Sequence, residues 1–171
     1  MMGTDVREAV PDLDAILDIG IDYAKSRFAE NHEVRPMWIA ETNDNTLMMV
    51  PGLIEDKDEQ IAALRAIFKA KHVVRYVMIQ EAWMVELRPD NVASIAAAKL
   101  MAPSKHPDRR EVLIVHAESK TECTSATYYI LRPERGTPTL SPPKFAPRST
   151  FSEGRMFELL RDPSPSKRKD H

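Results

Sequence analysis

The chain contains a single cysteine, Cys123, among its 171 residues, so no disulfide can form within it. Its first ten residues, MMGTDVREAV, lack the basic start and apolar core of a secretory signal. Charged residues interrupt every apolar segment before it reaches the ~18 residues of a membrane span. We therefore expect a reduced, cytoplasmic protein that is not embedded in a membrane.

Glycine is also scarce, and the five glycines never fall into the GxGxxG or GxxxxGK patterns of phosphate-binding loops. The sequence thus gives no positive support for nucleotide binding, and no cofactor is predicted. The net charge of −2 provides no overall field that would attract nucleic acid or anionic lipid. Any site for a polyanion must therefore be local.

Apolar residues recur at three- and four-residue steps in two segments, which predicts amphipathic helices over residues 12 to 30 and 56 to 71. Asp56 and Glu59 have the spacing of a capping box at the start of the second helix. Between these helices, two short apolar runs flank the turn sequence NDN and predict a β-hairpin.

Residues 73 to 87, VVRYVMIQEAWMVEL, read as a strand that is apolar on both faces. Such a strand needs cover on both sides, from helices on one face and from another element or a partner chain on the other. Trp83, Met78 and Met84 are the candidate interface residues. Two further strands are predicted at 111 to 118 and 124 to 132, as antiparallel neighbours.

The segment from 89 to 103 predicts a helical or mobile excursion that ends at Pro103. Prolines are frequent from Pro133 onward, and a short possible helix and a basic tail follow them. We therefore predict a single α+β domain over residues 1–132. The segment 133–171 is expected to extend over the surface or to be disordered.

Residues 104 to 119, SKHPDRREVLIVHAES, gather many residue types that carry chemistry. On a strand, His116 and Glu118 would share one face, as two metal ligands must. However, the HPD sequence has no recognised ligand spacing, and two neighbouring arginines oppose a bound cation. A turn followed by a strand is the favoured interpretation, and no metal is predicted. Together with one residue of the preceding strand, the candidate polar site comprises Glu81, His106, Asp108, Arg109, Arg110, Glu111, His116 and Glu118.

Glu81 would share a strand face with Trp83, and an apolar setting could raise its pKa and make it an acid or base. The favoured alternative is a structural ion pair with an arginine such as Arg109 or Arg110 on a neighbouring strand. A basic, aromatic surface for nucleic acid is weaker still, because acids interleave with its residues as densely as bases do. Its candidates are Arg109, Arg110, Lys120, Tyr128, Tyr129, Arg132 and Arg135.

The segments RYVMIQEAWMVE and HPDRREVLIVHAES resemble small uncharacterised bacterial proteins that carry an EAW strand and an HPDRREV turn and strand. The matching part covers roughly residues 56 to 132. The resemblance implies a bacterial or phage origin. It carries no known activity, so it assigns a role to no residue.

These patterns predict an α+β fold with an antiparallel or mixed sheet of about five strands and helices on one face, in the order α-β-β-α-β-(α)-β-β. No complete catalytic set is present. The sequence therefore favours a non-enzymatic binding or assembly module that binds a protein or a second copy of itself. The alternative is a metal-dependent hydrolase or nuclease that uses the His/Asp/Glu cluster at 106–118.

Overall fold

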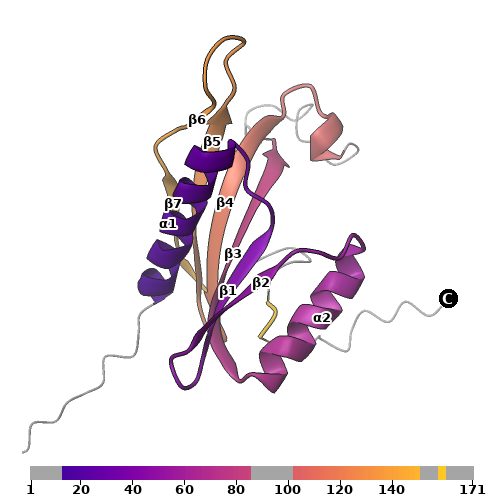
Figure 1. The fold of residues 1–171 in the computed structure, drawn as a ribbon, viewed down its shortest axis with the longest axis vertical. Coiled ribbons are helices and arrows are strands. Elements are labelled where there is room, and N and C mark those ends of the chain that lie inside the picture. Colours follow the sequence, from indigo (N-terminus) through magenta and orange to yellow (C-terminus); the bar gives the residue numbers. More distant parts are fainter. Residues whose placement is uncertain (1–12, 86–101, 151–157, 161–171) are drawn as a thin grey trace, which may run out of the picture.

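The computed structural model describes residues 13–85, 102–150 and 158–160. These residues form an α+β fold with an antiparallel sheet of seven strands, which confirms the predicted class (Figure 1). The strand order is β2-β1-β3-β4-β5-β6, and β7 also pairs with β5. The elements are α1 (Leu13–Asn31), β1 (Met37–Thr42), β2 (Leu47–Pro51), α2 (Lys57–Ala70), β3 (Val73–Met84), the 3-10 turn η1 (Pro103–Lys105), β4 (Arg110–Ser119), β5 (Cys123–Leu131), β6 (Thr139–Leu140) and β7 (Lys144–Ser149).

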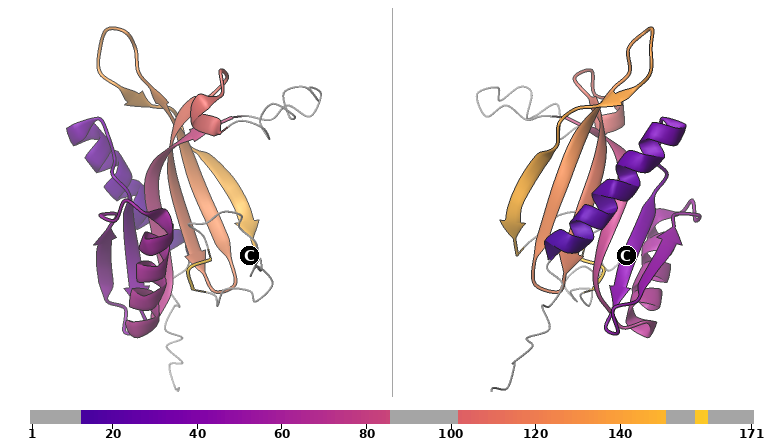
Figure 2. Two further views of the ribbon diagram at one scale, coloured as in Figure 1. Left: turned by 90° about the vertical axis from the view of Figure 1, so that its right-hand side faces the viewer. Right: turned by 60° about the vertical axis from the view of Figure 1, so that its left-hand side comes forward.

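Helix α1 covers the side of the sheet that we call the first face, where Val77 and Ile79 of β3 point. Leu13, Ile16 and other apolar side chains of α1 pack there against residues of β1, β3, β4 and β5. The right-hand view of Figure 2 shows α1 lying across these strands. This core accounts for the apolar period of the predicted helix, which the structure confirms.

Helix α2 covers the opposite side, the second face, where Tyr76 and Met78 point. The Asp56 side chain caps this helix by accepting hydrogen bonds from the amides of Asp58 and Glu59 at 2.9 and 3.0 Å. The expectation that the helices share one face is wrong, because α1 and α2 lie on opposite sides of the sheet (Figure 2). Each apolar face of β3 is thus buried by a helix of its own chain.

The predicted strands form, and the sheet also extends beyond them. Residues 37–51 form the expected hairpin β1–β2, and β4 and β5 are antiparallel neighbours as predicted. The proline-rich segment after Pro133, expected to run over the surface, adds β6 and β7, which both pair with β5. The strand count is therefore higher than the predicted five.

Parts of two other predictions lie outside the described residues. The expected excursion over 89 to 103 is described only from residue 102, where a single 3-10 turn precedes His106. Of the possible C-terminal helix, only residues 158–160 are described, and they form a turn. Neither helix of the described part is long and apolar enough to cross a membrane.

Candidate functional site

The polar residues of the second face form a buried network around one carboxylate. His116 and Glu118 share this face as predicted, and His116 Nε2 lies 2.8 Å from Glu118 Oε1. The Tyr76 hydroxyl donates to Glu118 Oε2 at 2.6 Å from the opposite position on β3. Burial and the Glu118 carboxylate raise the pKa of Tyr76 well above its usual value. The sequence did not indicate this tyrosine.

His106 and Asp108 lie in the turn between η1 and β4. The Asp108 amide donates to His106 Nδ1 at 3.1 Å, and the His106 side chain is buried. The Arg109 amide donates to the His106 carbonyl at 3.2 Å, which closes the turn. These bonds fit the predicted turn, in which the polar groups satisfy one another.

Glu81 lies on the first face and takes part in an ion pair, with Arg132 rather than with Arg109 or Arg110. The Arg132 guanidinium binds both oxygens of Glu111 at 2.8 Å and lies 4.0 Å from Glu81 Oε2. The amide of Val34 donates to Glu81 Oε1 at 2.8 Å. Burial raises the pKa of Glu81 above its usual value, and the Val34 amide and Arg132 oppose this rise.

Arg109 and Arg110 each stack on an aromatic ring. The Arg109 guanidinium carbon lies 5.0 Å from the centre of the Trp83 ring, and that of Arg110 lies 3.8 Å from the centre of the Tyr129 ring. Stacking of this kind holds a guanidinium in place while its N–H edge stays available. Because Tyr129 is buried, its ring offers little surface for stacking a nucleobase.

The eight candidate residues therefore separate into distinct groups. Glu81 and Glu111 belong to the first face, whereas His116 and Glu118 belong to the second. Within the residues that the structure describes, no group of three His, Cys, Asp or Glu side chains could hold a metal ion. The arrangement of these residues gives the hydrolase or nuclease interpretation no metal-binding group to build on.

The three candidate interface residues differ in their access to a partner. Met78 is fully buried beneath α2, so it is not available for contact with another chain. Met84 is partly buried, and Trp83 is 44% exposed. Since α1 and α2 cover both faces of β3, the apolarity of this strand no longer requires a partner.

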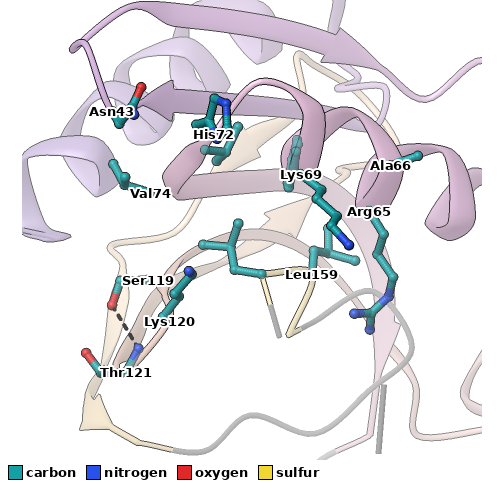
Figure 3. Close-up of a pocket in the computed structure, with 13 residues that line it drawn as sticks. Asn43, Arg65, Ala66, Lys69, His72, Val74, Ser119, Lys120, Thr121 and Leu159 are labelled. Atoms are coloured by element: carbon teal, nitrogen blue, oxygen red, sulfur yellow. Dashed lines mark hydrogen bonds between the residues drawn. The ribbon is translucent and has the colours of Figure 1, made fainter. Parts of the chain in front are cut away.

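A cleft of about 800 Å³ opens between α2 and the β4–β5 turn, and we call it the basic cleft. Figure 3 shows Arg65, Lys69 and His72 on the α2 side and Lys120 on the turn opposite. Its apolar lining includes Phe68, Val73 and Leu159, and its other residues are Asn43, Ala66, Val74, Ser119, Thr121 and Leu160. No acidic side chain is among these residues.

Backbone bonds fix the rim of the basic cleft. The Asn43 amide donates to the carbonyl of His72 at 2.9 Å, which ties the β1–β2 turn to the end of α2. Across the cleft, Ser119 Oγ accepts from the amides of Thr121 and Glu122 at 3.3 and 3.1 Å. These bonds fix the conformation of each wall of the cleft.

The polar side chains of the basic cleft differ in their contacts with the described part of the chain. Arg65 Nη1 donates to the carbonyl of Glu158 at 3.1 Å. In the part of the chain that the structure describes, the side chains of Lys69 and His72 have no hydrogen-bond or ion-pair partner. Lys69 also lies in the last turn of α2, where a cation offsets the negative end of the helix dipole. Lys120 adds a cation from another element, the β4–β5 turn.

Sequence reasoning missed this cleft almost entirely. Arg65 and Lys69 are four residues apart, a spacing that places two cations on one side of a helix. This was the only local signal. The convergence of Lys120 with that helix side depends on the pairing of β3 with β4 and cannot be read from spacing.

Comparison of the chain with protein-family models, with curated proteins and with solved structures found no match.

Proposed function

We propose that the protein is a non-enzymatic binding protein whose basic cleft takes a small molecule with an anionic group beside an apolar part. The observation that carries the proposal is the convergence of Arg65 and Lys69 on Lys120 around an apolar lining. Ligand pockets usually measure about 300 to 1,000 Å³ and combine apolar walls with a few polar groups. The basic cleft fits both criteria.

The choice of an anion follows from charge. The chain as a whole carries a net charge of −2, whereas the described residues that line the cleft include cations and no acid. Lysine and arginine bind phosphate and carboxylate groups through charge-assisted hydrogen bonds. The aromatic ring of Phe68 and the side chain of Val73 suit an apolar part of the same molecule.

The buried polar residues support binding rather than catalysis. His116 and Glu118 hydrogen-bond to each other within the core, and Glu118 accepts a further bond from Tyr76. A general acid or base must reach its substrate, and these side chains are enclosed by protein.

Calorimetry with phenyl phosphate, benzoate, inorganic phosphate and benzyl alcohol tests the proposal. We expect phenyl phosphate or benzoate to bind more tightly than inorganic phosphate, which has no apolar part, and than benzyl alcohol, which has no anionic group. Whichever of phenyl phosphate and benzoate binds more tightly shows whether the cleft prefers phosphate or carboxylate. Added salt should weaken this binding.

Lys69→Met retains most of the apolar stem and removes the charge. It should weaken binding about 10- to 100-fold, since a charge-assisted hydrogen bond contributes about 1.5 to 3 kcal/mol. Lys71→Met, at an exposed position just after α2, is the matched control and should leave affinity unchanged. Equal losses in both variants, or no binding of any probe at millimolar concentration, would contradict the proposal.

A further inference from the structure

Residues 158–160 occupy the second face in the manner of a bound peptide. The Glu158 amide donates to Glu118 Oε2 at 2.7 Å, and its carbonyl accepts from Arg65 Nη1 at 3.1 Å. The Leu159 amide donates to the Tyr76 hydroxyl oxygen at 3.5 Å. Both backbone groups of Glu158 are therefore satisfied by side chains of other elements.

The side chain of Leu159 anchors this segment. It is 3% exposed and belongs to the core cluster that contains Phe68 and Tyr76. Leu160 packs against the same cluster, and both leucines line the basic cleft. Figure 3 places Leu159 between the α2 wall and the β4–β5 turn.

Two features distinguish this contact from ordinary core packing. Glu158 has a φ of +58°, a left-handed conformation that is uncommon for a residue other than glycine and that surrounding contacts must hold. In addition, the carbonyl of Glu158 accepts a hydrogen bond from Arg65, one of the cations that line the basic cleft. The segment thus occupies both an apolar and a cationic part of the proposed ligand site.

We infer that residues 158–160 form a latch that competes with the ligand of the basic cleft. When the latch is docked, Leu159 fills apolar space and Glu158 engages Arg65. When a ligand with an anionic and an apolar part binds, it displaces Leu159 and its anionic group binds the Arg65 guanidinium. This inference rests on the proposed function and adds regulation to the same site, because affinity then depends on the stability of the latch.

The first test measures hydrogen exchange in the full chain, with and without saturating phenyl phosphate. In the free protein, the amides of Glu158 and Leu159 should be protected by their bonds to Glu118 and Tyr76. Saturation with the probe should speed their exchange at least tenfold. Unchanged or stronger protection in the bound protein would overturn the latch, even if binding itself depends on Lys69.

The second test is Leu159→Ala, which weakens the latch and should tighten phenyl phosphate binding by about 5- to 150-fold, the usual range of such coupling. The control is Leu131→Ala, at an exposed leucine of β5, which should bind as the wild type does. If Leu159→Ala binds phenyl phosphate with the affinity of the wild type, and Lys69→Met weakens that binding, the latch is refuted and the proposed function stands. Absence of phenyl phosphate binding in the wild type at millimolar concentration refutes the proposed function and the latch together.

Discussion

Tyr76 and Glu118 lie directly opposite each other on β3 and β4, and the tyrosine hydroxyl donates to the carboxylate at 2.6 Å inside the core. The same carboxylate contacts His116 and the amide of Glu158. One buried acid thus connects two central strands to the segment at 158–160. A buried carboxylate without donors is costly, so each of these partners is expected to contribute to stability.

Tyr76→Phe should lower the free energy of unfolding by about 1 to 3 kcal/mol, because it removes one donor from the buried Glu118 carboxylate. Denaturant unfolding measures this difference. Tyr23→Phe is the matched control, since the Tyr23 hydroxyl has no hydrogen-bond partner among the described residues. We expect that control to change stability by less than about 0.5 kcal/mol. A similar loss in both variants would mean that the hydroxyl of Tyr76 has no special role.

At Gly20, α1 packs against β3 and β4 with too little room for a side chain. A Cβ atom at this position would lie 2.5 Å from Val77 Cγ2 and 2.9 Å from Val115 Cγ1. Gly20→Ala should therefore destabilise the fold by about 1 to 3 kcal/mol through overpacking. This cost exceeds the ~1 kcal/mol that alanine gains over glycine in a helix.

The double variant Gly20→Ala/Val77→Ala provides the check on that explanation. Val77→Ala alone should destabilise by leaving a cavity, and the added methyl at position 20 should partly fill it. Thermal and denaturant unfolding of the four proteins gives the coupling energy, which we expect to be favourable by about 0.5 to 3 kcal/mol. Strictly additive effects would show that the contact between Gly20 and Val77 does not limit the packing of α1.

Asp56→Ala should cost about 0.5 to 2 kcal/mol of unfolding free energy, because the amides of Asp58 and Glu59 lose their capping acceptor. Asp56→Ser retains an acceptor at the same position and should recover most of the loss. Denaturant unfolding of both variants measures the difference. Equal destabilisation by alanine and serine would contradict a capping role for this side chain.

Local signals predicted the helices and most strands, as α2 illustrates. Its cap, its apolar period and its final lysine lie within one short segment, and they determine its bounds without any information from the rest of the chain. Strand β7 was missed because prolines are frequent from Pro133 onward, and one of them, Pro147, lies within this strand. However, β7 lies at an edge and pairs with β5 alone, where a proline is tolerated.

The candidate site was less predictable because it depends on contacts between distant segments. The contact between Tyr76 and Glu118 depends on the register of β3 against β4, and the long connection between them does not determine that register. The same holds for Arg132, which reaches Glu81 and Glu111 from the end of β5. Residue types indicated which groups could act, but only the sheet shows which of them meet.

The carboxyl group of Glu81 should make stability depend on pH. Burial raises its pKa in the folded protein above the ordinary value of 4.5, so the folded state binds more protons than the unfolded state at pH values between the two pKas. The stability associated with the protonated form is fully present below the unfolded pKa and is lost as the pH rises through the folded pKa. Ionised Glu81 is therefore a cost at neutral pH, which the Val34 amide and Arg132 only partly offset.

Glu81→Gln preserves an acceptor for the Val34 amide and cannot ionise. Relative to the wild type, this variant should become more stable as the pH is raised from about 4 to about 7, because only the wild type loses stability to this ionisation. Denaturant unfolding at several pH values measures the difference in unfolding free energy between the two proteins. Most other titrating groups are common to both, so their contributions cancel. Glu55→Gln, the same substitution at an exposed position, is the control. A stability difference for Glu81→Gln that is flat or moves the other way would show that Arg132 outweighs burial at this carboxylate.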